Sequence, residues 1–319
     1  MAENEQEYGE MYEVEEDSSV RDTDDGGAII TLDDSPTPAE SEFYANLAET
    51  MPSWELANLG TTLCDILEKD KEARKKRDEQ YEEGLRRTGL GDDAPGGASF
   101  TGASKVVHPM LTQGCVDFSA RVMKELFPAD GPAKDKIIGE PTLEKQEKAQ
   151  RVVKFLNWQM TEQMPEFRSE LEQLSTQLPL GGGQYLKITW DPNKKRPLPM
   201  FIAIDDIYLP FAATNFYSAE RKTHVQYVTR IEYQKRVESG MYMDVDLVAD
   251  PLPPDESKAE TANNKIEGRQ QDSYNVDGLR TIFECYIIHD FGDEHGLAPY
   301  VISVDKATQR VLAIYRNWA

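Results

Sequence analysis

Between Pro109 and Pro128 the apolar side chains recur every three or four positions. They are Leu111, Cys115, Phe118, Val122 and Leu126. This spacing is typical of one face of an α-helix, and proline suits both the start of a helix and the position beyond its end. We therefore predict a helix that starts at or after Pro109 and buries this face, with Phe118 in the core.

Two more stretches have helical spacing. Residues 41–87 carry an apolar stripe and then, from residue 68 on, closely mixed acidic and basic side chains, which favours a helix with an exposed, ion-paired end. The stripe consists of Leu56, Leu59, Leu63, Ile66 and Leu67. Residues 142–178 are also predicted to be helical, and Pro165 should kink this segment or split it in two.

The period of the pattern changes from 3.6 to 2 after the three glycines at 181–183. From there on, alternation of apolar and polar side chains predicts strands. One short helix is expected among them, at 232–238. The strands are expected at 184–190, 200–204, 225–230, 280–291, 299–305 and 310–318. This order predicts an α+β fold, in which N-terminal amphipathic helices are followed by a mainly antiparallel β region.

Charge is unevenly distributed along the chain. The 319 residues carry a net charge of −23, and residues 1–42 hold fifteen of the 58 acidic side chains against one base, Arg21. A segment so rich in charge and so poor in large aliphatic residues cannot bury enough apolar surface to offset its chain entropy. We predict a disordered acidic tail over residues 1–41. It is either a solvated segment or an arm that docks on a basic partner.

The rest of the chain is predicted to form a helical part at 42–180 and a β-rich part at 181–319, with a polar insertion at about 250–278. Its composition gives no sign of tight binding to a DNA duplex. The one basic cluster is Arg74, Lys75, Lys76 and Arg77, which is either a solvated helix face or a contact for nucleic acid or a partner. No apolar run approaches the length of about 20 residues that a membrane-spanning helix needs.

Candidate chemistry is sparse. The three cysteines are Cys64, Cys115 and Cys285, which we interpret as buried small hydrophobes. Residues 289–295 contain metal-ligand residue types, but a solvated turn has the same composition. The pair Asp205 and Asp206 is of a kind that a two-metal nuclease uses, although one such pair in an acidic chain is weak support. No cofactor is expected.

Several segments resemble a known family. The sequence SKVVHPML…VDFSARVMKELFPADGP at 104–132 resembles the N-terminal helix of portal proteins of short-tailed phages. The sequence PYVISVD…VLAIYRNW at 299–318 resembles the end of the N-terminal wing in the same family, and GGG-YLKI-WD at 181–191 is also similar. The matching residues are Val107, Pro109, Arg121, Phe127, Pro128, Tyr300, Arg316, Asn317 and Trp318. The likeness covers most of residues 41–319 in the family's order.

The resemblance implies a structural virion protein rather than an enzyme. In this family twelve subunits form a homo-oligomeric ring at one capsid vertex, through which double-stranded DNA is packaged and ejected. Terminase, the major capsid protein, scaffold and tail adaptor proteins are the implied partners, and assembly takes place in the host cytoplasm. The alternatives are a metal-dependent nuclease or other hydrolase built on the β part, and a capsid-associated adaptor.

Two expectations concern the last predicted strand. The family continues beyond this point, so we expect the chain to be a truncated or partial portal. The strand is apolar on both faces, with Val311 and Ala313 on one and Leu312 and Ile314 on the other. Such a strand is normally covered on both sides. Without further chain to cover it, we expect this surface to be open and prone to self-association.

Overall fold

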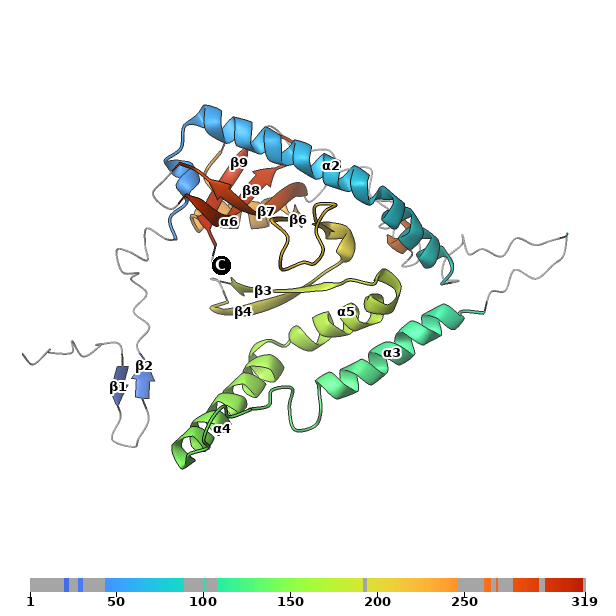
Figure 1. Ribbon diagram of the computed structural model, residues 1–319, viewed down its shortest axis with the longest axis vertical. Coiled ribbons are helices and arrows are strands. Elements are labelled where there is room, and N and C mark those ends of the chain that lie inside the picture. The colour runs from blue at the N-terminus through green and yellow to red at the C-terminus, as the bar shows by residue number, and fades with distance from the viewer. Residues whose placement is uncertain are drawn as a thin grey trace, which may run out of the picture. The chain divides into compact units, whose positions relative to one another are not determined.

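The structure of the protein is a computed structural model, shown in Figure 1. It describes residues 20–22, 28–30, 44–88, 100, 108–191, 194–245, 261–264, 268, 278–292 and 296–317. Residues 1–45 and 46–319 form two separate units. The helices of the second unit together with its antiparallel strands confirm the predicted α+β class.

The first unit contains a short strand pair that the sequence did not predict. Strand β1 (Val20–Asp22) pairs antiparallel with β2 (Ala28–Ile30). Apart from these strands, the predicted tail lies outside the described residues, and its disorder stays a prediction.

Helix α2 (Ser53–Arg86) lies within residues 41–87, where the sequence predicts an amphipathic helix. Its apolar stripe is buried most deeply at Leu63 and Leu67. The charged half beyond Glu68 is exposed on one side only, because it also buries Asp70, Tyr81 and Leu85. Gly60 belongs to the same inner face, and an added Cβ there would lie 2.0 Å from the carbonyl oxygen of Gln309. The helix therefore approaches the β region so closely that only glycine fits at this point.

The β region is built around one five-stranded antiparallel sheet, in the order β5-β6-β7-β8-β9. Its strands are β5 (Ile207–Tyr208), β6 (Arg221–Val228), β7 (Arg280–Asp290), β8 (Leu297–Asp305) and β9 (Val311–Arg316). Four of them match predicted strands within a few residues. The two-residue strand β5 is too short to produce an alternating pattern and therefore could not be predicted from the sequence.

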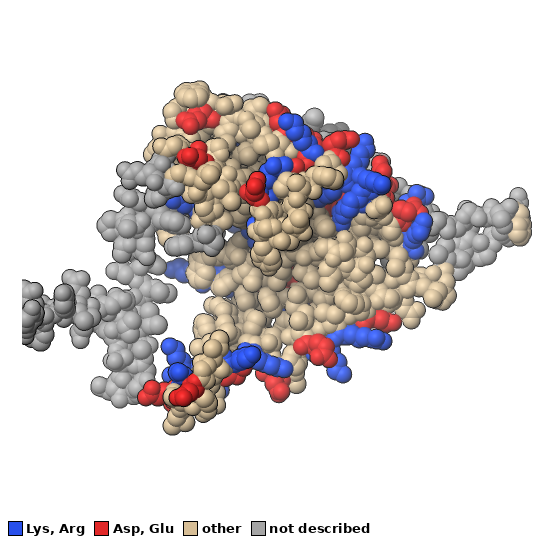
Figure 2. Space-filling view, in the orientation of Figure 1, with Lys and Arg blue, Asp and Glu red and all other residues tan. Residues whose placement is uncertain are grey.

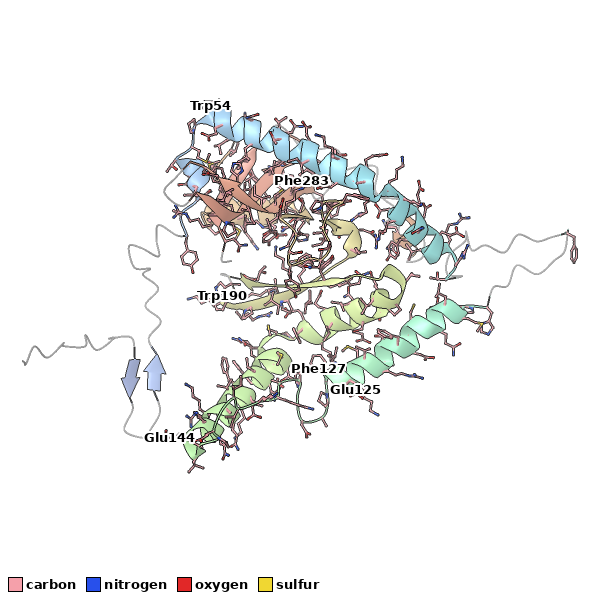
Figure 3. All side chains as sticks on the ribbon, in the orientation of Figure 1. Trp54, Glu125, Phe127, Glu144, Trp190 and Phe283 are labelled. Carbon is pink, nitrogen blue, oxygen red and sulfur yellow. The ribbon has the colours of Figure 1, made fainter. Side chains whose placement is uncertain are left out.

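The two faces of this sheet are covered by different helices. On one face Phe283, Ile302 and Ile314 pack with Leu63 and Leu67 of α2, which crosses over the sheet in Figure 1 and Figure 3. On the other face Val228, Ile282 and Leu312 form a smaller cluster with Tyr242. Side chains of α6 (Arg230–Glu238), among them Tyr233, pack against that smaller cluster.

The expectation of an open, sticky last strand is wrong. All four residues from Val311 to Ile314 are at most 2% exposed, because the α2 core covers one face of β9 and the cluster beside α6 covers the other. The free edge is also covered: the Asn46 side chain accepts a hydrogen bond from the Ile314 amide at 2.9 Å. The cover therefore comes from residues that precede the strand, and polar substitutions of Leu312 and Ile314 are expected to unfold the protein.

Several further helical elements and a β-hairpin belong to the second unit. Helix α3 (Met110–Leu126) is followed by α4 (Leu143–Trp158), a π-helical turn η2 (Gln159–Gln163) and α5 (Phe167–Gly181). The predicted split at Pro165 is confirmed, because η2 ends and α5 begins on either side of it. Strands β3 (Tyr185–Asp191) and β4 (Arg196–Ile202) then pair as the predicted hairpin.

The buried face of α3 shares only Cys115 with the predicted one. The residues of α3 that are buried are Cys115, Ser119 and Met123. They face α5, where the Thr176 hydroxyl donates to the Ser119 hydroxyl at 3.1 Å. Phe118 remains 39% exposed, as do Leu111 and Leu126 at similar levels. The prediction that Phe118 lies in the core is therefore wrong, because the stripe of Cys115, Ser119 and Met123 is the one that packs against α5.

Candidate functional site

A cluster of interacting polar side chains surrounds Glu284, in the middle of β7. The Glu284 carboxylate accepts a hydrogen bond from Gln226 Nε2 at 2.7 Å and lies 3.2 Å from His224 Nδ1. Lys187 of the β3–β4 hairpin donates to the same carboxylate oxygen. Three elements, β3, β6 and β7, thus meet at one carboxylate.

Strand register explains why these side chains come together. Glu284 pairs directly with His224 on β6, and Gln226 follows His224 by two residues on the same face. Phe283 and Cys285, on either side of Glu284, point to the opposite face and into the α2 core. The sheet therefore separates an apolar face from one that is polar at its centre.

The cluster continues toward α6 through a chain of hydrogen bonds. Arg236 of α6 donates to Gln226 Oε1 at 2.9 Å and to the Tyr242 hydroxyl at 2.6 Å. Gln226 therefore bridges Arg236 and Glu284. Side chains of both neighbouring elements, the β3–β4 hairpin and α6, are tied to the sheet by this one network.

Electrostatics keep the central carboxyl group ionised. Burial alone would raise the pKa of Glu284, but the hydrogen bond with His224 and the positive charge of Lys187 outweigh it and lower the pKa to about 2. A group with this pKa cannot act as a general acid near neutral pH. Its geometry suits a compensated ion pair that fixes the hairpin against the sheet.

Of the predicted pair of acids, Asp205 does not lie in an open site. Asp205 is mostly buried, its carboxylate lies 3.3 Å from Arg77 Nη1, and burial raises its pKa. Within the described ranges no group of three or more His, Cys, Asp or Glu side chains could hold a metal ion. Of the 289–295 cluster, His289 packs edge-on against Phe291, whereas residues 293–295 lie outside the described residues.

The predicted basic cluster divides into two pairs. Arg74 donates to the carbonyl oxygens of Ile204 at 2.8 Å and Ile207 at 2.7 Å, and its guanidinium lies 3.9 Å from the centre of the Tyr208 ring. Arg77 donates to Asp205 and also to the Gly181 carbonyl oxygen at 3.1 Å. Both arginines are therefore bound within the chain, where they hold the loop before β5 and the end of α5 to α2.

Lys75 and Lys76 remain on the exposed side of α2. The Lys75 side chain is 60% exposed, with Glu72 at 3.8 Å. Figure 2 shows basic and acidic side chains intermingled along this helix rather than a patch of one sign. Contact of Lys75 and Lys76 with nucleic acid or a partner stays a prediction.

We expect Arg74→Lys to lower the free energy of unfolding by about 1–3 kcal/mol, because one ammonium group cannot satisfy the carbonyl oxygens that the planar guanidinium reaches. Lys75→Ala, on the exposed side of the same helix, is the control and should change it by about 0.5 kcal/mol or less. Chemical denaturation of both variants measures the difference. Equal losses would mean that the Arg74 contacts contribute nothing to stability.

The residues that carry the family resemblance occupy structural positions. On the helical side, Pro109 caps the start of α3, Arg121 is exposed on that helix, and Pro128 follows its end. Phe127 packs edge-on against Phe167 of α5, with ring centres 5.9 Å apart (Figure 3). Val107 lies outside the described residues.

On the β side, Tyr300 is fully buried and packs edge-on against Phe291 at 4.7 Å. Arg316 ends β9, and the Asn317 amide donates to the Pro299 carbonyl oxygen at 2.9 Å. Trp318 is not among the described residues. These contacts join the ends of β8 and β9, so those matched residues that the structure describes support the fold.

Large apolar side chains are exposed on both α3 and α4. Helix α4 has no buried residue, although it carries five large apolar side chains that are 38–71% exposed. These five are Leu143, Val152, Phe155, Leu156 and Trp158, and we call them the α4 apolar face. Helix α3 adds others, including Met110 and Val116. Exposed apolar surface of this density usually marks a contact with another molecule.

Comparison with known protein families and with curated proteins found no match to this chain. Among the described residues, no helix combines the length and the apolar character needed to cross a membrane.

Proposed function

We propose that this protein is a structural subunit of a portal-like ring, which assembles from copies of the chain at one vertex of a phage capsid. The observation that carries the proposal is the α4 apolar face. A helix with no buried residue gains little stability from its own chain, so its exposed apolar side chains need a neighbour. The sequence resemblance supplies the kind of assembly, a ring of identical subunits.

In this assembly the β region is the stable base of the subunit, and the helices α3 and α4 make contacts between subunits. The ring would let double-stranded DNA pass and would bind terminase, the major capsid protein, scaffold and tail adaptors. The exposed charges of α2, including Lys75 and Lys76, are one surface for such partners. The proposed location is the virion, after assembly in the host cytoplasm.

The enzymatic alternative has less support from the described residues. A two-metal nuclease needs carboxylates that are ionised and open to solvent, whereas Asp205 is mostly buried and engaged by Arg77. The alternative of a capsid-associated adaptor differs from a portal in its assembly, because an adaptor need not form a ring by itself.

Native mass spectrometry tests the proposal. We expect the purified chain to form an oligomer of one defined mass, and Phe155→Glu to shift it toward monomer because the charge faces the subunit contact. Ile231→Glu is the matched control, since Ile231 is 70% exposed on α6, away from α4. A monodisperse monomer for the unmodified chain would contradict the proposal, and equal behaviour of the two variants would place the contact elsewhere.

A further inference from the structure

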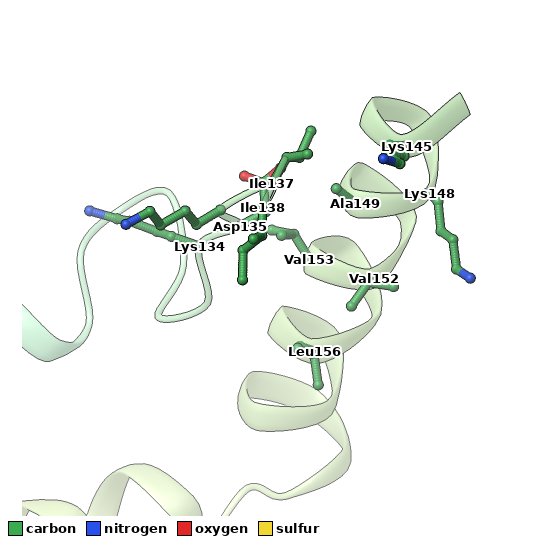
Figure 4. Close-up of a pocket in the computed structure, with 11 residues that line it drawn as sticks. Lys134, Asp135, Ile137, Ile138, Lys145, Lys148, Ala149, Val152, Val153 and Leu156 are labelled. Carbon is green, nitrogen blue, oxygen red and sulfur yellow. The ribbon is translucent and has the colours of Figure 1, made fainter. Parts of the chain in front are cut away.

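A groove runs between residues 134–138 and helix α4, with a volume of about 350 Å³. Its residues are Lys134, Asp135, Lys136, Ile137, Ile138, Lys145, Lys148, Ala149, Val152, Val153 and Leu156. Figure 4 shows Ile138 and Val153 on facing sides of the groove, with Lys134 and Lys148 at its opposite margins. The groove therefore has an apolar floor and a rim that is mostly basic.

The rim has an excess of positive charge, since four lysines and one aspartate line the groove. Lys145 donates to the Glu140 carbonyl oxygen at 3.3 Å. Over the described ranges no ion pair involves Lys134, Lys136 or Lys148. The floor is also uncovered, because Ile138 is 89% exposed and Val152 is 47% exposed.

An occupant that satisfies both features is an acidic peptide with apolar side chains spaced along it. Its carboxylates would pair with the lysine rim while its apolar side chains cover the floor. Residues 1–19 of this chain have that composition. They contain eight acidic side chains and no basic one, together with the larger side chains Tyr8, Met11, Tyr12 and Val14.

We propose that the groove binds the acidic segment of residues 1–19 from a second copy of the chain. Val152 and Leu156 belong both to the groove and to the α4 apolar face. The inference rests on one part of the proposed function, namely that α4 contacts a neighbouring copy of the chain. Each subunit would receive the acidic segment of the next, which is a head-to-tail contact of the kind that closes identical subunits into a ring.

A photo-crosslinking experiment on the full chain tests this. The probe is p-benzoylphenylalanine in place of Ile138, in a mixture of normal and ¹⁵N-labelled copies. We expect crosslinks from position 138 to residues 1–19, with normal and labelled peptides joined to one another. Because the rim acts through charge, the triple change Lys134→Glu, Lys136→Glu and Lys148→Glu should reduce these crosslinks at least tenfold, and raised salt should weaken them as well.

The matched control reverses the charge of three exposed lysines elsewhere, with Lys69→Glu, Lys195→Glu and Lys235→Glu, and should leave the crosslinks unchanged. Crosslinks confined to single copies, crosslinks to other segments, or crosslinks that survive the rim reversal would each overturn the inference. Native mass spectrometry of the same samples separates the two proposals. An oligomer without these crosslinks contradicts only the groove assignment, whereas a monomer contradicts the assembly itself.

Discussion

Replacing Phe283 with alanine is expected to lower the free energy of unfolding by about 3–5 kcal/mol, because it leaves a cavity in the core between the sheet and α2. Phe283 is 1% exposed and packs with residues of both elements. Phe118→Ala removes the same number of atoms from a side chain that is 39% exposed. It should cost about 1 kcal/mol or less in the dissociated chain.

Urea denaturation measures the free energy of unfolding of both variants. The protein concentration must be low, because assembly would add to the apparent stability. In assembly the order of the two variants should be reversed, so that Phe118→Ala has the larger effect. Phe118→Ala is expected to weaken oligomers at a protein concentration where Phe283→Ala, if folded, still forms them. Equal losses of unfolding free energy would mean that α3 presents Phe118 to the interior after all.

Replacing Glu284 with leucine is expected to lower the free energy of unfolding by about 3–5 kcal/mol, because Lys187 would remain mostly buried without its partner. Combining it with Lys187→Met should recover part of that loss, since no uncompensated charge then remains. Thermal and urea denaturation of the two variants decide between the outcomes. If the double variant is no more stable than the single one, the ion pair is not what holds the hairpin to the sheet.

The same carboxyl group makes stability depend on pH. The pKa of Glu284 is about 2 in the folded protein, compared with its ordinary value of 4.5. The unfolded chain therefore binds the proton more readily, and the stabilisation of about 3 kcal/mol is present above pH 4.5 and is lost as the pH falls toward 2. Glu284→Gln should flatten this part of the curve, and Glu72→Gln, at an exposed position, should not. Identical curves would contradict the pKa assignment.

Much of the fold follows from local pattern. The period of 3.6 in α2 and the period of 2 in the strands predict these elements because each buries one face against the core. Pro165 splits its helix because a proline lacks the amide hydrogen that an α-helix needs. The local pattern does not show which element packs against each face of a helix or strand. Phe118 lies on a regular apolar stripe, yet the Ser119 stripe packs on α5, because this choice depends on residues far away in the sequence.

The last strand illustrates the same limit. Its two apolar faces require cover on both sides, and the expectation of an open surface was wrong because its sequence does not reveal that Asn46 and α2, which precede it, supply part of that cover. The candidate site was missed for a related reason. Glu284 is one charge within the apolar run TIFECYII, which signals a buried group that needs a partner. Its partners, Lys187 and His224, are 97 and 60 residues away and have no signal of their own.

Electron microscopy of single particles of the full, unmodified chain tests the central claim most directly. The account predicts closed rings of one size with an open centre, in which α3 and α4 lie at the contacts between neighbouring subunits. Particles of Phe155→Glu should be single subunits, and particles of Ile231→Glu should be rings. Isolated subunits of the unmodified chain, or open and irregular aggregates without a closed ring, would contradict the account.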